Sequence, residues 1–122
     1  MSNFRYFDWD RTAQVLVVDG DQRHAESLCV GLSRQGLKAR VFSSPEQAAQ
    51  RLRRPSSDYG IVILNISNLL PNWVKVLAKL QAACFESGVY PLPLFLCVST
   101  IKQLPELELR IERMGARYVF EG

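Results

Sequence analysis

The sequence predicts an α/β domain in which helices cover both faces of a doubly wound, five-stranded parallel sheet. Two observations lead to this fold class. Short runs of β-branched and other apolar residues recur along the chain, and segments with apolar residues at three- and four-residue steps separate them. Such alternation of buried strands and amphipathic helices indicates a parallel sheet with right-handed crossovers. The 122 residues favour one domain, large enough to form a core without disulfide support.

The predicted strands are short, and the third is apolar at every position, which is typical of a strand buried on both faces of a parallel sheet. In chain order they are QVLVVD at 14–19, KARVFS at 38–43, IVIL at 61–64, LFLCV at 94–98 and ARYVF at 116–120.

Four helices are predicted between these strands, each with one apolar face. The residues that form the four faces are Ala25, Leu28, Cys29 and Leu32; Ala48, Ala49 and Leu52; Val74, Leu77, Leu80 and Cys84; and Leu107, Ile111 and Met114.

Capping residues predict where the helices begin and end. Ser44 is expected to cap the second helix, with Pro45 in the first helical position and Gln47 completing a capping box. Asn72 is expected to cap the third helix.

Glycines predict the helix ends, because a left-handed residue commonly follows the last turn. Gly36, Gly88 and Gly115 should end the first, third and fourth helices, and the second should end near Pro55.

The charge pattern argues against a nucleic-acid contact. The net charge is only +3, and the densest basic patch is RLRR at 51–54. We interpret this patch as a solvated helix end, where cations favour the helix dipole, because no aromatic interleaving or reading helix accompanies it. No direct nucleic-acid binding is expected.

Cysteine usage and targeting signals point to a cytoplasmic protein. Cys29, Cys84 and Cys97 are odd in number, form no CxxC and lie in apolar surroundings, so we expect free buried thiols. With His24 as the only histidine, a zinc site is not expected. No apolar run approaches the ~18–20 residues of a membrane span, and the N-terminus lacks the apolar core of a signal peptide.

Polar residues follow four of the predicted strands. They are Asp19-Gly20-Asp21 after the first strand, Asn65 after the third, Ser99-Thr100 after the fourth and Glu121 after the fifth. In open parallel sheets ligands bind at the carboxyl ends of the strands. These residues are therefore the candidate site.

With these motifs in place, the chain resembles a response-regulator receiver domain of the chemotaxis-regulator type over residues 14–122, after an aromatic extension at 1–13. VLVVDGD resembles the family's first strand with its acidic pair, and IVILN the third strand, which ends in the phosphoacceptor aspartate. CVST resembles the fourth strand with its hydroxyl, and GARYVFEG the fifth, where the family has an aromatic followed by lysine and proline. The resemblance implies a flavodoxin-like sheet of order 2-1-3-4-5, with the family's fifth helix absent.

The departures from the family fall on its chemistry. Asn65 stands at the phosphoacceptor position, Gly20 replaces one acidic residue, and Glu121-Gly122 stand in place of lysine and proline. Asp19 and Ser99 remain. An amide is no nucleophile for an acyl phosphate, and a carboxylate in place of lysine removes the cationic clamp that phosphoryl transfer needs.

Several side chains have alternative roles. Asp19 and Glu121, helped by Asp21, could hold a cation, whereas Asp21 on its own is expected to cap the first helix. The hydroxyls of Ser99 and Thr100 are expected to satisfy turn backbone groups.

Tyr118 matches the aromatic that reports switching in the family, and is either a remnant of that switch or a packed or rim aromatic.

The resemblance and its departures predict a non-enzymatic, cofactor-free pseudo-receiver that acts independently of phosphorylation as a protein-interaction module in signalling or transcription control. Without a fifth helix, part of an apolar sheet face lacks cover, which favours a protein partner or a homodimer and no membrane contact. The four aromatics in FRYFDW at 4–9 are expected to dock on this domain or on a partner. The alternative is a working phosphoacceptor, or a small-ligand or metal-binding receiver, that uses the remaining carboxylates.

Overall fold

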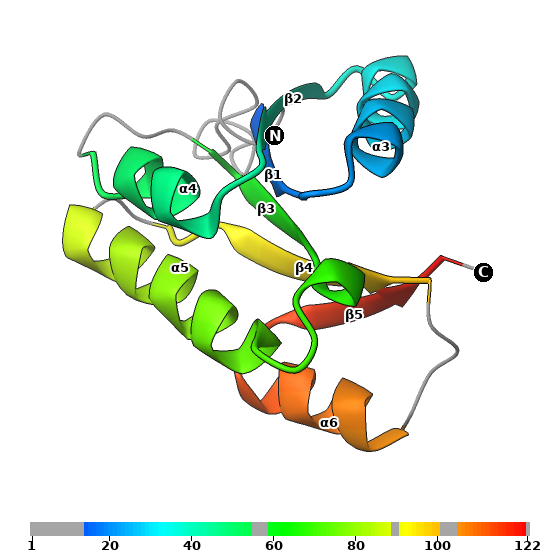
Figure 1. Ribbon diagram of the computed structural model, residues 1–122. Helices are drawn as coiled ribbons and strands as arrows, with labels where there is room; N and C mark the ends of the chain where they lie inside the picture. The colour runs from blue at the N-terminus through cyan, green and yellow to red at the C-terminus, as the bar shows by residue number, and fades with distance from the viewer. Residues whose placement is uncertain (1–13, 55–58, 89–90, 101–104, 122) are drawn as a thin grey trace, which may run out of the picture.

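The computed structural model describes residues 14–54, 59–88, 91–100 and 105–121. Its strands form one parallel sheet of order β2-β1-β3-β4-β5, as the sequence predicts (Figure 1). The strands are β1 (Gln14–Val18), β2 (Lys38–Phe42), β3 (Ile61–Asn65), β4 (Leu94–Ser99) and β5 (Arg117–Phe120). The aromatic segment 4–9, Pro55 and Gly122 lie outside the described residues.

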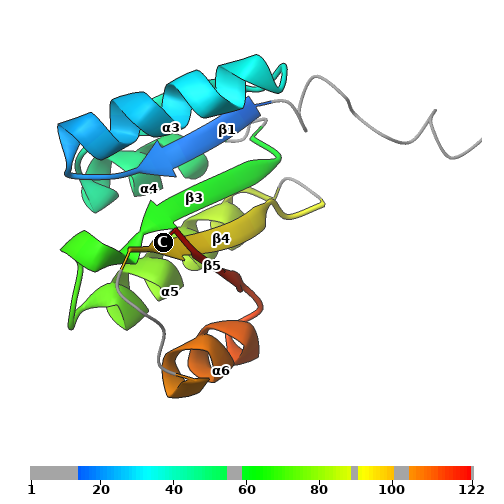
Figure 2. The same cartoon turned by 90° about the vertical axis from the view of Figure 1, so that its right-hand side faces the viewer.

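Helices lie on both faces of the sheet. The described part of the chain contains α3 (Gln22–Arg34), α4 (Pro45–Leu52), α5 (Trp73–Ser87) and α6 (Pro105–Arg113), with a single 3-10 turn, η1 (Ile66–Asn68), after β3. α3 covers one face, and α4, α5 and α6 cover the other (Figure 2). None of the helices in the described ranges is long and apolar enough to cross a bilayer.

The sheet separates two apolar clusters, because successive side chains of a strand point to opposite faces. The larger cluster packs Leu16, Leu64 and their neighbours against α4, α5 and α6. The smaller cluster consists of Val15, Val17, Ile63 and Val98, against which Leu28 and Leu32 of α3 pack. The central strands β1 and β3 are buried from both sides, which explains why nearly all their residues are apolar.

The helix ends follow the predicted glycines: Gly36, Gly88 and Gly115 all have positive φ, at 80°, 72° and 82°. A residue with a β-carbon is strained in this region, whereas glycine adopts it freely. The same reason makes these three boundaries readable from the sequence.

The helix starts were predicted with mixed success. The Ser44 side chain accepts a hydrogen bond from the Gln47 backbone at 3.4 Å, but its hydroxyl donates to Glu46 and no return bond from the Gln47 side chain occurs among the described contacts. Asn72 occupies the predicted cap position of α5, but its side chain makes no cap hydrogen bond, so the predicted side-chain contact is wrong. Its φ of −88° and ψ of 8° differ from the extended backbone that turns a cap side chain toward the first turn.

Two of the three cysteines are buried as predicted, and the third is not. Cys84 and Cys97 lie in the core, and burial raises the pKa of the Cys97 thiol to about 12, so it stays protonated. Cys29 is only half-buried, because it lies at the edge of the helix face that packs on the sheet and lines a groove between α3 and β2.

The basic patch at the end of α4 contacts the protein itself. The Arg51 guanidinium lies 5.4 Å from the centre of the Tyr59 ring, and Arg53 donates to Glu86 at 3.0 Å. These contacts agree with the interpretation of RLRR as a helix end.

One strip of the sheet has no helix over it in the described structure. α3 packs beside β2, and on the same face no helix of the described structure lies over β4 and β5 (Figure 2). Leu94 is 45% exposed and Val119 is 39% exposed. Their strand partners Ile61 and Val98 pack at the smaller cluster, so both side chains belong to the α3 face. We call Leu94, Leu96 and Val119 the open strip.

Replacing a fully buried leucine should destabilise the domain far more than replacing an exposed one. Leu77 is 0% exposed, and Leu77→Ala is expected to lower the free energy of unfolding by about 2–5 kcal/mol through lost burial and a cavity. Leu109, 47% exposed on α6, is the matched control, and Leu109→Ala should change it by less than about 0.5 kcal/mol. Urea denaturation of both variants measures this; equal losses would contradict the assigned core.

Candidate functional site

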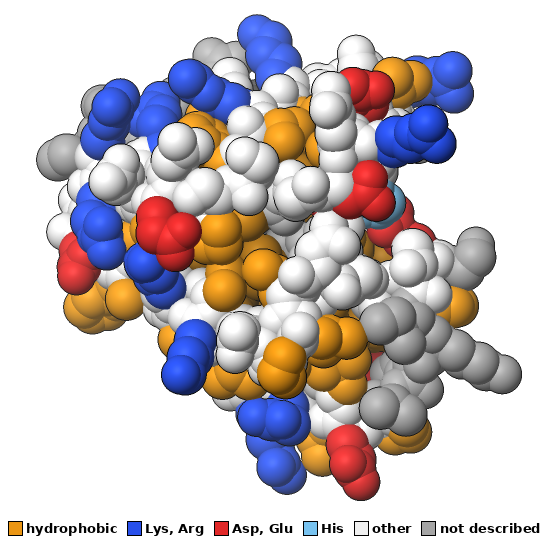
Figure 3. Space-filling model, in the orientation of Figure 1, with side chains coloured by type: hydrophobic (Ala, Val, Ile, Leu, Met, Phe, Trp, Pro, Cys, Tyr) orange, Lys and Arg blue, Asp and Glu red, His pale blue; other side chains and the backbone are white. Residues whose placement is uncertain are grey.

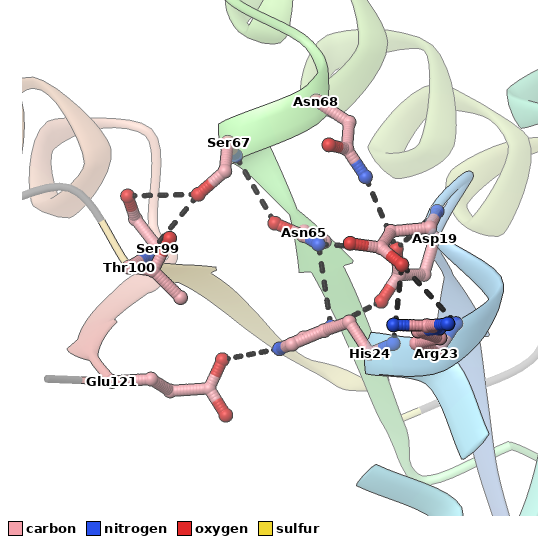
Figure 4. A network of polar contacts seen from close by, with 10 residues as sticks. Asp19, Arg23, His24, Asn65, Ser67, Asn68, Ser99, Thr100 and Glu121 are labelled. Carbon is pink, nitrogen blue, oxygen red and sulfur yellow. Dashed lines mark hydrogen bonds and ion pairs between the residues drawn. The ribbon is translucent and has the colours of Figure 1, made fainter. Parts of the chain in front are cut away.

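The ends of four strands bring one polar network together at the carboxyl edge of the sheet (Figure 4). The network contains the predicted Asp19, Asn65, Ser99 and Glu121. It also contains residues that the sequence did not single out for the site: His24 of α3, and Ser67 and Asn68 of η1.

Asp19 is the centre of this network and is 2% exposed. Its Oδ1 accepts three hydrogen bonds: from the Asp21 backbone at 2.9 Å, from Asn65 Nδ2 at 3.0 Å and from Asn68 Nδ2 at 3.2 Å. Its Oδ2 contacts His24 Nδ1. A buried carboxylate is costly unless donors surround it, and here four donors do so.

Asn65 supplies one of these donors, and its orientation is determined by its neighbours. Its Oδ1 accepts from the Ser67 backbone at 3.1 Å, which leaves the Nδ2 amide facing Asp19. A carboxylate at position 65 would place a second negative charge beside Asp19; at an effective dielectric of 20, two charges 4 Å apart repel by about 4 kcal/mol. The neutral amide avoids this repulsion.

His24 lies between two carboxylates that come from opposite ends of the described sequence. Its Nδ1 contacts Asp19, and its Nε2 lies 2.6 Å from Glu121 Oε1. The side chains of Asp19, His24 and Glu121 are 0%, 18% and 36% exposed. In the space-filling view the histidine lies in a notch with acidic side chains beside it (Figure 3).

The surroundings of His24 favour its charged form. Burial lowers the pKa of the imidazole, but the hydrogen bonds and negative charges of Asp19 and Glu121 outweigh burial, so the pKa is raised above the ordinary 6.5. Only an imidazolium donates from both ring nitrogens. The protein thus places its own protonatable base between the two carboxylates of the site.

The hydroxyl groups of the site pair with each other. Ser99 Oγ lies 3.1 Å from Ser67 Oγ, and the Thr100 backbone donates to the same Ser67 oxygen at 3.1 Å. The Ser67 hydroxyl, on η1, thus accepts from the backbone at the end of β4, and the expected role of the Ser99 and Thr100 hydroxyls stays a prediction.

The remaining predicted residues take ordinary positions. Asp21 caps α3 as expected, accepting from the backbones of Arg23 and His24 at 3.1 and 3.3 Å, so its carboxylate is directed at the helix. Gly20 is exposed, and a β-carbon there would have its nearest neighbour at 4.0 Å, so space does not require glycine. Tyr118 is partly buried against the larger cluster, in agreement with a packed aromatic.

The arrangement is a poor fit to a magnesium ion. The oxygens of Asp19 already accept from four donors, Gly20 adds no side-chain ligand, and His24 separates Asp19 from Glu121. Among the residues that the structure describes, no group of three or more His, Cys, Asp or Glu side chains is arranged to hold a metal. Magnesium requires several hard oxygens in octahedral geometry.

Comparisons with known proteins bear on the fold. No protein-family model matches the chain, and no curated protein matches it. Among solved structures, the chain is similar to a response regulator receiver protein from Burkholderia phymatum, with 20% sequence identity and a TM-score of 0.68. The similarity covers 88% of this chain and 82% of that chain. The chain therefore has a receiver-like fold.

Asn65→Asp should destabilise the protein at neutral pH. The change removes the donor to Asp19 and buries a second carboxylate, so we expect a loss of about 2–4 kcal/mol in the free energy of unfolding at pH 7, and less at pH 5, where one carboxyl is more easily protonated.

The chain offers a matched control for this test. Asn68→Asp alters a donor to the same Asp19 oxygen at an exposed residue, where water screens the charge, and should cost less. Urea unfolding at both pH values compares the two variants. Equal costs would show that burial of Asn65 is not the cause.

Proposed function

We propose that this domain is a pseudo-receiver: a regulatory module in signal transduction or transcription control that works through protein contacts and without phosphorylation. The observation that carries the proposal is Asn65, which stands where the resemblance places the phosphoacceptor. Its amide nitrogen donates to Asp19 and its oxygen accepts from Ser67. An amide held in this way offers no nucleophilic oxygen for an acyl phosphate.

The charges around Asn65 support the same conclusion. A transferred phosphoryl group is anionic and needs cations at its oxygens. Here Glu121 replaces the family's lysine, and the positive charge of His24 lies between Asp19 and Glu121, which already carry two negative charges. An entering phosphoryl group would meet excess negative charge. Nothing in this arrangement calls for a catalytic role or a cofactor.

The open strip supports a role in protein contacts. Exposed apolar side chains commonly mark interfaces, and Leu94 and Val119 are exposed near the partly buried Leu96. The exposed Arg117, the register partner of Leu96, lies on the same face. β5 is also an edge strand of the described sheet, and an edge strand can pair with a strand of another chain. We infer a second copy as the occupant, because two copies packed face to face about a two-fold axis would cover both open strips at once.

Phosphorylation chemistry provides the direct test of the pseudo-receiver. The protein is incubated with acetyl phosphate and magnesium, beside a receiver domain with an intact aspartate, and its intact mass is measured. We expect no phosphoryl adduct on this protein and an adduct on the comparison protein. An adduct on this chain would support the alternative, a working phosphoacceptor that uses the remaining carboxylates, and would overturn the proposal.

A charge on the open strip should prevent self-association. Val119→Glu is expected to convert a concentration-dependent dimer into a monomer, because a carboxylate would be buried at the contact. Leu109→Glu is the matched control: Leu109 is 47% exposed on α6, away from the strip, and its variant should still dimerise.

Light scattering after size exclusion, over a wide concentration range, measures the mass. A wild-type protein that remains monomeric throughout would rule out the second copy.

A further inference from the structure

The contacts of His24 join parts of the domain that are not neighbours in the sheet. His24 lies in the first turn of α3 and Asp19 follows β1, whereas Glu121 follows β5, 97 residues after His24. β3 and β4 lie between β1 and β5, so three strand spacings of about 4.8 Å separate these two strands. We call the contact Asp19–His24–Glu121 the histidine bridge; it connects the end of β5 to α3 across the carboxyl edge of the sheet (Figure 4).

The bridge requires a proton. A carboxylate accepts hydrogen bonds and donates none, and a neutral imidazole has a single N–H group. Both ring nitrogens of His24 face carboxylate oxygens. Loss of one proton therefore places a nitrogen lone pair against one of the two carboxylates.

The two ends of the bridge differ in strength. Asp19 is buried, and three donors besides His24 bond to its carboxylate. Glu121 is 36% exposed, and in the described structure its carboxylate contacts His24. We therefore expect a neutral His24 to keep its N–H at Nδ1, toward the buried carboxylate of Asp19. Glu121 can turn to water at little cost.

We propose that the histidine bridge is a proton-dependent clasp, which holds the end of β5 against α3 and releases it at Glu121 when His24 loses its proton. This proposal adds regulation to the proposed interaction function. Because the pKa of His24 is raised in the folded state, its stabilisation is complete below the unfolded pKa and is lost as the pH rises through the folded pKa.

Apart from Asp19 and Glu121, no described charged side chain is directed at the His24 ring, so the protonation of His24 controls the bridge. β1 contributes Asp19, and β5 leads to Glu121; β3 contributes the neutral Asn65, and η1 contributes no charged residue. On α3 itself, Asp21 is directed at the helix backbone, and no described ion pair joins Arg23 to either carboxylate.

The clasp lies next to the proposed contact surface. A groove of about 260 Å³ runs beside it, lined by His24, Ser27, Leu28, Gly31, Leu32 and Glu121. Val119, of the open strip, is two residues before Glu121. The Glu121 backbone donates to the Ser99 carbonyl at 2.8 Å, so release of the Glu121 side chain would loosen the end of β5, which carries Val119, without detaching it from β4.

The chain's single histidine makes the clasp directly observable by NMR. The imidazole is titrated in wild type, in Glu121→Gln and in Glu26→Gln, an equally charged change on α3 whose carboxylate contacts Gln22 and not His24. We expect a titration midpoint above 6.5 in wild type, a downward shift in Glu121→Gln and no shift in Glu26→Gln. Above the midpoint the ring nitrogen shifts should report the Nδ1–H tautomer.

Amide exchange measures the release itself. As the pH rises through the midpoint, the protection factors of residues 117–121 should fall roughly tenfold in wild type, the size expected for losing one hydrogen bond to a charged group. In Glu121→Gln they should be low and independent of pH. A wild-type midpoint at or below 6.5, equal midpoints in wild type and Glu121→Gln, or constant protection would overturn the clasp and leave the pseudo-receiver untouched. A phosphoryl adduct in the acetyl phosphate experiment would overturn the pseudo-receiver and leave the clasp untouched.

Discussion

The carboxylate of Asp19, buried at the carboxyl edge of the sheet, is the constraint on which the rest of the site depends. An isolated charge in such a position costs several kcal/mol. The turn after β1, Asn65 of β3, Asn68 of η1 and His24 of α3 each direct a donor at it. Four segments of the chain are thus held in place by the need to satisfy one side chain.

This constraint also accounts for the chemistry of the neighbouring positions. A second acid at position 65 would repel Asp19, whereas an amide donates to it. Glu121 places a second carboxylate at the carboxyl edge of the sheet, and the imidazole of His24 contacts it. The same scaffold can carry different chemistry at the ends of its strands, because the apolar residues that form the core lie mainly along the strands and helices and not at the carboxyl ends of the strands.

Local signals in the sequence were sufficient for most of the fold. Apolar runs located the five strands to within a residue or two, and the glycines that follow α3, α5 and α6 marked their ends because their backbone conformation excludes other residues. Predictions that depended on side-chain direction were less successful. Asn72 has the composition of a cap without the backbone angles of one, and Cys29 lies at a rim rather than in the core.

The sequence by itself determined the order of the elements and the set of strand ends at which Asp19, Asn65, Ser99 and Glu121 meet, because strand and helix periodicity are properties of neighbouring residues. Only the tertiary structure decided what these residues do to one another. The contact between His24 and Glu121 joins residues 97 positions apart and exists because β1 and β5 run parallel in one sheet. No local pattern encodes that distance, so a histidine that reads as an ordinary helix residue becomes the cation of the site.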